Sequence, residues 1–404
     1  MVKRSVPVHG FVAPGFEPVR EEFLRNFEER GELGAACAIY RQGEKVVDLW
    51  GGYRDGRSRA PWEEDTLVIV FSSTKGLSAL AMALANSRGY FDYEAPVTHY
   101  WPEFAQNGKE HITIRQLLAH EAGLAVIEEP LTRQILADKD ALAAILARQR
   151  PLWEPGTHHG YHSFSLGWYE SELIRRTDPQ HRTLGRFFQD ELATPLGLEV
   201  YIDIPSSLPA ERIAAVTQPG FWQILLGMPI WVFNPRSLIM CTFNPRTRNL
   251  LLGSPLLLNS PAFWAVEMPS AGGIGQASSI ARVYSIFATG GRELGLAEKT
   301  LAALRAPAQP PSGGWKDLVL HRDMAYASGF LKPFEGYRFG SSTAAFGAQG
   351  SGGSFGFADP EAQVGYAYVM NHQGVRLLDE PREKVLRDAF YRCLQRVAEH
   401  PVGA

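Results

Sequence analysis

The sequence predicts an α+β protein in which an antiparallel sheet is flanked by terminal helices and interrupted by a mostly helical insertion. Three observations predict this class. Strand patterns occur near both ends of the chain, helical patterns dominate its middle, and amphipathic helices open and close it. We therefore expect a discontinuous sheet lobe formed by residues 1–95 and 271–404, a mostly helical lobe formed by residues 96–270, and a functional site between them.

The first hundred residues predict a helix, a hairpin and a second helix. Pro18 and the acidic residues after it indicate the start of an amphipathic helix. Strand patterns at 35–40 and 45–50 flank a short Arg-Gln-Gly turn, which is typical of a hairpin. A third apolar run, 68–70, precedes leucines spaced three and seven residues apart, so Ser72 is expected where a helix begins.

Helical signals dominate the insertion, and strand signals return in the last third. Residues 113–116 form a Thr-Ile-Arg-Gln capping box. A helix is expected near 278–290, followed by strands at 350–357 and 363–370 that are separated by an Asp-Pro-Glu turn. Pro381 then opens a closing helix with an apolar stripe.

Composition excludes several classes of protein. The 404 residues are 45% hydrophobic and 21% charged, with a formal net charge of −3, which is no electrostatic footprint for nucleic acid. The first 20 residues lack an apolar run of signal-peptide length, so we expect a cytoplasmic protein. Three scattered cysteines without metal-type spacing are interpreted as structural: Cys37, Cys241 and Cys393.

The uncharged stretch 219–235 required a check for membrane insertion. It is shorter than the roughly 20 residues that a span needs, and Pro229 interrupts it, so no membrane span is expected. A pocket wall or a buried lid is the main interpretation. Contact with lipid or with a greasy substrate is the alternative.

Ser72 and Lys75 have the spacing of a nucleophile and its base. Three residues apart on a helix, they share one face, so the amine can reach the hydroxyl. The start of a helix also favours a developing oxyanion. An S-x-x-K match occurs often by chance, however, and the plain interpretation is a serine that caps an exposed helix.

Two later segments provide the context that this motif needs. A Pro/Gly turn at 153–160 precedes Tyr161, a phenol that could act as a general base beside a cation, and Ser163 follows two residues later. The glycine-rich run 350–354 allows the backbone to approach a ligand closely and to offer an N–H group to an oxyanion.

Together these motifs resemble the β-lactamase and penicillin-binding superfamily, in the branch of class C β-lactamases and family VIII carboxylesterases. The ordered motifs are Ser72-x-x-Lys75, Tyr161-x-Ser163 and Ser351-Gly352-Gly353. The run 111–124 also resembles a helix of that family, and the resemblance extends over most of residues 20–395. It implies a β-lactamase/transpeptidase-like fold.

The resemblance also implies a role for each matching residue. Ser72 would be the nucleophile, and Lys75 and Tyr161 would share its proton. The amides of Ser72 and Ser354 would bind the oxyanion, and Ser163 would position Lys75 or the substrate. Substrate positioning is expected from the third motif: Ser351, Gly352 and Gly353.

Two departures from the class C pattern favour neutral esters over antibiotics. The second motif ends in Ser163 instead of asparagine, and the third begins with Ser351 instead of lysine. Ser351 cannot supply the positive charge that meets the carboxylate of a β-lactam, so antibiotic hydrolysis should be weak.

Three further features of the sequence are a second serine motif, a cluster of histidines and a set of aromatic residues. Gly352 to Gly356 forms a G-x-S-x-G sequence that would make Ser354 a nucleophile, but too few residues follow for the rest of an α/β-hydrolase. His158, His159 and His162 lack the glutamate of a zinc-protease motif, so no metal and no cofactor are expected. Aromatic residues form a possible substrate pocket: Trp153, Tyr169, Trp231, Phe233 and Phe334.

The sequence therefore predicts a serine carboxylesterase that acts on a small-molecule ester through an acyl-enzyme on Ser72. The alternatives are an acyltransferase that uses the same site, a weak β-lactamase or D-amino-acid peptidase, and a non-catalytic binding protein. The natural substrate, the stereoselectivity and the oligomeric state are left open.

Overall fold

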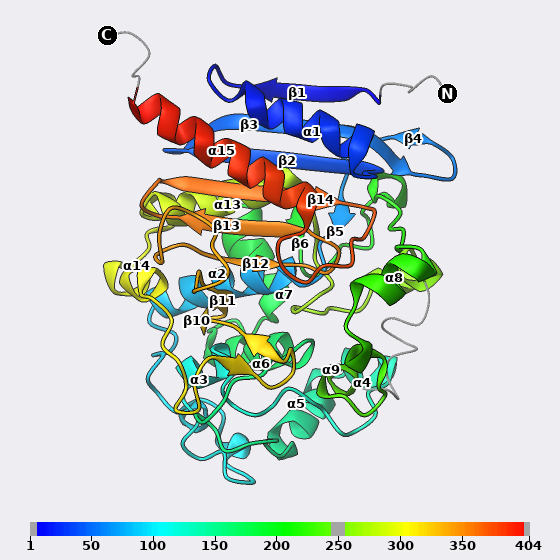
Figure 1. Ribbon diagram of the computed structural model, residues 1–404. Coiled ribbons are helices and arrows are strands. Elements are labelled where there is room, and N and C mark those ends of the chain that lie inside the picture. Colours follow the sequence, from blue (N-terminus) through cyan, green and yellow to red (C-terminus); the bar gives the residue numbers. More distant parts are fainter. Residues whose placement is uncertain (1–5, 244–254, 400–404) are drawn as a thin grey trace.

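A computed structural model of the chain describes residues 6–243 and 255–399. Its main feature is an antiparallel sheet to which both ends of the chain contribute (Figure 1). Strand β2 pairs with β14 along its whole length, from Ala35 opposite Met370 to Arg41 opposite Val364. In spatial order the strands are β1 (Val8–Val12), β3 (Glu44–Asp55), β2 (Gly34–Arg41), β14 (Val364–Met370), β13 (Phe355–Asp359), β12 (Phe346–Gln349), β11 (Phe330–Leu331) and β10 (Tyr326–Ala327), and β4 (Ala60–Pro61) pairs with β3.

The two predicted hairpins of the sheet are confirmed. Gln42 and Gly43 link β2 to β3, and both have positive φ angles, 53° and 85°, as a tight two-residue turn requires. The Asp-Pro-Glu turn joins β13 to β14. Strand β1 was not predicted, because its short sequence has no alternation of apolar and polar residues.

Helices cover both faces of the sheet. The helices α1 (Glu17–Glu29) and α15 (Pro381–Glu399) pack together on one face, and α13 (Ala277–Ala288) covers the other (Figure 1). Strand β14 places large side chains such as Tyr366 toward the terminal helices and small ones such as Gly365 toward α13. A Cβ atom on Gly365 would lie 2.3 Å from the carbonyl oxygen of Ala281, so this glycine permits close packing of the helix on the strand.

Helix α2 (Ser73–Ser87) lies between the sheet and the helices of the insertion (Figure 1). It is apolar on all sides and buried from Ser73 to Ala85, which is the expected behaviour of a helix without a polar face. It packs against β11, β12 and β13 on one side and against α6 and α7 on the other.

In the described part of the segment between Pro96 and Ala271 the regular elements are helices, as predicted, apart from the two-residue strand β6 (Val200–Tyr201). Its capping box at Thr113 and Gln116 is formed. The helices are η1 (Val97–His99), η2 (Pro102–Phe104), α3 (Ile114–Leu118), α4 (Arg133–Ala137), α5 (Lys139–Arg148), α6 (Ser165–Thr177), α7 (Leu184–Phe188), η3 (Gln189–Ala193), η4 (Ala210–Arg212), α8 (Phe221–Gly227), η5 (Ile230–Phe233), α9 (Leu238–Thr242), α11 (Pro255–Leu258) and α12 (Pro261–Trp264).

Short elements complete the fold. A three-stranded sheet of β5 (Val68–Ile69), β7 (Ile274–Gly275) and β6 (Val200–Tyr201) lies at the start of α2. The remaining elements are η6 (Arg292–Leu294), α14 (Glu298–Arg305), β8 (Lys316–Asp317) and β9 (Arg322–Asp323). No helix among the residues described is long and apolar enough to cross a membrane.

The predicted strand at 350–357 is only half correct. Residues 346–349 form β12, residues 355–359 form β13, and the glycine-rich run between them is the turn that joins the two strands. Gly352 and Gly353 have φ angles of 85° and 117°, a conformation that breaks a strand and that glycine adopts without strain.

The prediction of a buried lid at 219–235 is wrong for the residues at its centre. Phe221, Trp222, Leu226 and Ile230 are 69–86% exposed. The segment forms two short helices, α8 and η5, that Pro229 separates, and neither contains a buried residue.

Candidate active site

Ser72 lies at the start of α2 because the chain turns sharply just before it. The Val70 N–H donates to the carbonyl oxygen of Gly273 at 2.9 Å, which fixes the chain beside the small sheet. Phe71 then takes a φ of 47°, which is unusual for a bulky residue. Its carbonyl oxygen accepts a 2.5 Å hydrogen bond from the Thr74 hydroxyl, so the turn is secured by the first turn of the helix. No local pattern in the sequence predicts this turn at Phe71.

Lys75 reaches the Ser72 hydroxyl, as the helical spacing predicted. Its Nζ atom lies 3.4 Å from Ser72 Oγ, 2.6 Å from the carbonyl oxygen of Ser163 and 3.0 Å from that of Ser270. A neutral amine has two N–H donors and one lone pair. If the donors occupy the two carbonyl oxygens, the lone pair is left to face the hydroxyl of Ser72.

The environment of Lys75 favours this neutral amine. The side chain is only 3% exposed, and burial lowers the pKa of its ammonium group to about 7, while the charge of Glu170 raises it. A fraction of Lys75 is therefore a free base at neutral pH.

Tyr161 lies beside both residues. The Lys75 Nζ atom is 4.7 Å from the centre of the Tyr161 ring, and the Ser72 hydroxyl is near enough to the Tyr161 hydroxyl to lower its pKa. Burial raises the pKa of Tyr161 to about 12, the Ser72 hydroxyl lowers it, and the charge of Asp317 raises it. At neutral pH Tyr161 is therefore a neutral phenol, contrary to the expectation of a loosely held proton, and Lys75 is the residue of which a fraction is in the basic form.

Three residues that sequence analysis did not assign hold Tyr161 in place. The carboxylate of Asp317 raises the pKa of Tyr161 through its charge, and it accepts a 3.1 Å hydrogen bond from the hydroxyl of Tyr326, whose ring stacks on that of Tyr161 at 6.3 Å. His120 packs against the Tyr161 ring at 5.3 Å, and its Nδ1 accepts the N–H of His162 at 3.0 Å. His120 belongs to the 111–124 run, which was recognised without a role for its histidine.

Ser163 contacts Lys75 through its backbone. Its carbonyl oxygen holds the amine, whereas its hydroxyl is hydrogen-bonded to the Thr242 hydroxyl of α9 at 2.8 Å. The predicted positioning role thus belongs to a backbone atom that any residue at this position would supply.

The third motif is brought to the start of α2. The Ser354 hydroxyl donates to the carbonyl oxygen of Val70 at 2.7 Å and lies 3.0 Å from the Ser73 hydroxyl. A Cβ atom on Gly350 would lie 2.2 Å from that same Val70 oxygen and 3.2 Å from the Ser73 nitrogen, so a larger residue would push the hairpin away. Ser354 follows a turn between two strands and its hydroxyl is buried, which excludes the strand-to-helix elbow of an α/β-hydrolase.

A buried ionic network contacts the backbone of the 350–354 hairpin. The Arg382 guanidinium contacts carboxylate oxygens of Glu32 at 3.0 Å and Glu380 at 2.8 Å, and donates to the carbonyl oxygen of Gly352 at 3.2 Å. Gly374 donates its N–H to the same oxygen at 2.9 Å. Ser351 itself is exposed and lies 3.5 Å from the Gln373 amide nitrogen.

The five predicted pocket aromatics have different environments. Trp153 and Phe334 are, like Tyr161, partly buried against one large apolar cluster, and the Trp153 ring packs edge-on against His162 at 6.4 Å. Trp231 packs against His321 at 4.5 Å, and Phe233 is 45% exposed. The prediction for Tyr169 is wrong: it is fully buried against Trp101 and Phe104, and its hydroxyl donates to a backbone carbonyl of α5.

Two histidines of the 158–162 loop, His159 and His162, form hydrogen bonds with backbone groups. His159 contacts the carbonyl oxygen of Trp315 at 2.6 Å. His162 accepts the Leu124 N–H on Nε2, so its Nδ1 carries the proton that meets the Gly160 carbonyl at 2.7 Å. Burial lowers the pKa of His162 to about 4. Within ranges 6–243 and 255–399, no group of three His, Cys, Asp or Glu side chains is arranged to hold a metal ion.

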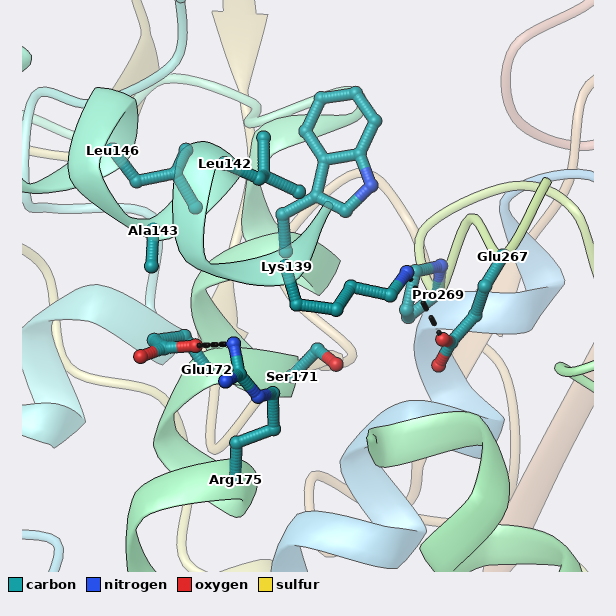
Figure 2. A pocket seen from close by; sticks show the side chains of 10 residues that line it. Lys139, Leu142, Ala143, Leu146, Ser171, Glu172, Arg175, Glu267 and Pro269 are labelled. Carbon is teal, nitrogen blue, oxygen red and sulfur yellow. Dashed lines mark hydrogen bonds and ion pairs between the residues drawn. The ribbon is translucent and has the colours of Figure 1, made fainter. Parts of the chain in front are cut away.

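Figure 2 shows a hollow elsewhere, between α5 and α6, with Pro269 and Glu267 on its other side. Its charged groups pair with one another: Lys139 with Glu267 at 3.4 Å, and Arg175 with Glu172 at 2.9 Å. The Ser171 hydroxyl accepts the Leu184 N–H. The hollow therefore lacks the nucleophile and base that Ser72 and Lys75 provide.

A serine and a buried lysine one helical turn apart, with a tyrosine beside them, have the arrangement expected of the β-lactamase and penicillin-binding superfamily. The β-lactamase family model matches residues 21–389, and the chain belongs to that family.

Several relatives match over most of their length. The esterase/β-lactamase LipL of Mycobacterium tuberculosis is 31% identical over 375 residues, which are 90% of this chain and 83% of LipL. A family VIII carboxylesterase structure is 35% identical, with a TM-score of 0.84 over 96% of this chain and all of that one. EstA from Arthrobacter nitroguajacolicus Rue61a is 32% identical, with a TM-score of 0.82 over 96% of this chain and 98% of EstA.

Proposed function

We propose that the protein is a serine carboxylesterase that cleaves neutral carboxylic esters through an acyl-enzyme on Ser72. The observation that carries this proposal is the position of the Lys75 amine, 3.4 Å from Ser72 Oγ, in a buried site that lowers the pKa of its ammonium group to about 7. The β-lactamase-fold esterases among the relatives support the choice of an ester substrate.

In the first step Ser72 Oγ attacks the ester carbonyl carbon, and its proton passes to the Lys75 amine. The Tyr161 hydroxyl, which lies beside Ser72 and Lys75, relays the proton from the Lys75 ammonium to the departing alkoxide as the carbon–oxygen bond breaks. The alcohol leaves and the acyl group stays on Ser72. In the second step water attacks the acyl carbon, the base takes its proton, and the acid departs as the Ser72 hydroxyl is restored.

Backbone N–H groups would bind the oxyanion of each tetrahedral intermediate. Ser72 supplies the first N–H from the start of α2, where the helix dipole adds to the effect. The second comes from the 350–354 hairpin, for which the sequence predicts the N–H of Ser354. The contact of this hairpin with Val70 and Ser73 supports that assignment.

The third motif favours substrates without a carboxylate near the reacting carbonyl. Ser351 is neutral, and Ser351 to Gly353 would position the substrate through backbone and hydroxyl groups. Trp153 is the aromatic residue that we place at the substrate, because its ring packs against His162, the residue after Tyr161. We also propose that the site lies between a sheet lobe, 1–95 and 271–404, and a helical lobe, 96–270. Lys75 of the sheet lobe donates to the carbonyl oxygens of Ser163 and Ser270 of the helical lobe, and these contacts support a site between the two.

The test is covalent labelling followed by turnover. A fluorophosphonate should add to Ser72 in the purified protein, as peptide mass spectrometry would show, and Ser72→Ala should take up no label. Nitrophenyl acetate and butyrate should be hydrolysed by the wild type. A label on another serine, or a folded wild-type protein that turns over neither ester, would contradict the proposal. Adding an alcohol and measuring the ester formed separates hydrolysis from acyl transfer.

A further inference from the structure

Glu170 is a buried carboxyl that the mechanism above does not use. It lies on α6, is 0% exposed, and neither of its oxygens meets a hydrogen-bond donor in the part of the chain that is described. Burying an unpaired carboxylate is costly, so such a group is kept neutral or is stabilised by a nearby cation. The surroundings of Glu170 offer one cation.

Glu170 lies against the face of α2 that carries Lys75. A Cβ atom on Gly329 would lie 3.4 Å from Glu170 Oε1 and 2.8 Å from the Cβ of Ala79, so the carboxyl and Ala79 meet at the same glycine. Ala79 is four residues after Lys75 and therefore lies on the same face of the helix, one turn further on. Helices α2 and α6 pack against each other.

The two groups influence each other's charge. Burial raises the pKa of Glu170 to about 8, and the positive charge of Lys75 lowers it. Burial lowers the pKa of Lys75 to about 7, and the negative charge of Glu170 raises it. Both groups therefore change charge close to neutral pH, and they titrate as a pair.

We propose that Glu170 is a positioning residue that sets the charge state of Lys75, holding it as an ammonium when ionised and releasing it as an amine when protonated. The inference rests on the proposed function of Lys75 as the base for Ser72. The exchange within the pair is balanced, because one proton moves from the Lys75 ammonium to the Glu170 carboxylate and leaves an amine and a carboxylic acid. The active forms are those in which Lys75 is an amine, whatever the charge of Glu170, because only the amine has a lone pair for the Ser72 proton.

The other titratable groups that face this pair keep their charge near neutral pH, with one exception. Burial keeps His120 and His162 neutral, with pKa values below the usual range. Tyr161 stays protonated because its pKa is about 12, and burial raises that of Tyr93, which faces Glu170 from the segment after α2. The exception is Asp317, where burial raises the pKa to about 6; it faces Tyr161 and is unchanged in the variants below.

The test is the pH profile of kcat/KM for nitrophenyl butyrate. Glu170→Gln keeps the shape of the side chain and removes its charge, so Lys75 should lose its proton at lower pH. The acidic limb of the profile should move down by about one pH unit, which raises the relative rate at low pH up to about tenfold. The matched control is Glu172→Gln on the same helix, where the carboxylate pairs with Arg175 and Arg176. Its acidic limb should stay in place.

A second variant and a second measurement protect the test against misfolding and against failure of the proposed function. Glu170→Leu replaces the carboxyl with an apolar side chain, which buried sites tolerate well, and should move the limb in the same direction. NMR of protein with ¹³C-labelled lysine should show the same shift in the titration of Lys75, identified by its loss in Lys75→Met. This readout needs no substrate, so it tests the inference even if no ester is hydrolysed. An unmoved Lys75 titration, or a rate loss at every pH without a moved limb, overturns the inference.

Discussion

The Nζ atom of Lys75 lies 2.6 Å from the carbonyl oxygen of Ser163, while the hydroxyl of Ser163 turns away to Thr242. The second motif therefore holds the base through its backbone and leaves its side chain to position α9. The carbonyl oxygen and the hydroxyl of Ser163 therefore have different partners, although the sequence motif treats the residue as one unit.

Ser163→Ala should reduce kcat/KM for nitrophenyl butyrate by less than about tenfold, because the carbonyl oxygen stays in place. Lys75→Met removes the base itself and should reduce it by about 10²–10⁴-fold. Steady-state kinetics on the two purified variants would check both values. A loss with Ser163→Ala as large as that with Lys75→Met would mean that the hydroxyl takes part in the chemistry.

The pH dependence of activity follows from the charge of Lys75. Its ammonium group has a pKa of about 7, and the base must be neutral, so kcat/KM should rise with pH through about 7 and level off above it. Tyr161, with a pKa of about 12, should not limit the rate below pH 10. Initial rates between pH 5 and 10 with a neutral ester would show this, and a rate that falls as pH rises through 7 would be incompatible with an amine base.

Stability should depend on pH through the same lysine. The pKa of Lys75 is about 7 in the folded protein and near 10.5 in the unfolded chain, so between these values the unfolded state binds more protons. Stability should therefore rise with pH from about 7 to about 10.5, and Lys75→Met should lose part of that rise in thermal melts.

Lys332 provides a matched control for the previous prediction. Burial lowers the pKa of Lys332 to about 7 as well, and its ammonium donates to backbone carbonyl oxygens at 2.7 and 3.3 Å and lies 5.6 Å from the centre of the Phe346 ring. Lys332→Met should flatten the rise of stability with pH in the same way but keep ester hydrolysis within about twofold of the wild type. A loss of activity in this variant would show that the melts report a general effect on the fold.

Ser354→Ala separates a structural hydroxyl from a nucleophile. The Ser354 hydroxyl donates to Val70, so its removal should lower the free energy of unfolding by about 1–3 kcal/mol. Fluorophosphonate labelling of Ser72 should persist in this variant. Denaturant titration and peptide mapping are the measurements, and a label lost with Ser354→Ala but kept with Ser72→Ala would support the rejected elbow.

The network behind the hairpin should be costly to break. Arg382→Met leaves Glu32 and Glu380 without their buried cation and should lower stability by about 3–5 kcal/mol. The control, Lys384→Met on the same helix, removes a partly exposed ion pair with Asp388 and should cost less than about 1 kcal/mol. Equal costs in chemical denaturation would show that Arg382 contributes no more than a surface charge.

The sequence by itself determined the elements that depend on neighbouring residues. The Gln-Gly turn, the capping box at Thr113, the amphipathic terminal helices and the helical spacing of Ser72 and Lys75 are set by local backbone and side-chain geometry. A match of ordered motifs added the family and pointed to Tyr161.

Tertiary structure alone decided the electrostatics and the partners of the site. Burial, which no local pattern records, lowers the pKa of Lys75 to about 7 and raises that of Tyr161 to about 12. Contacts between distant segments put Glu170 behind Lys75, Asp317 under Tyr161 and Tyr169 in the core. The apolar segment at 219–235 was misjudged for the same reason: its composition allows either burial or exposure, and only packing against the rest of the chain selects one.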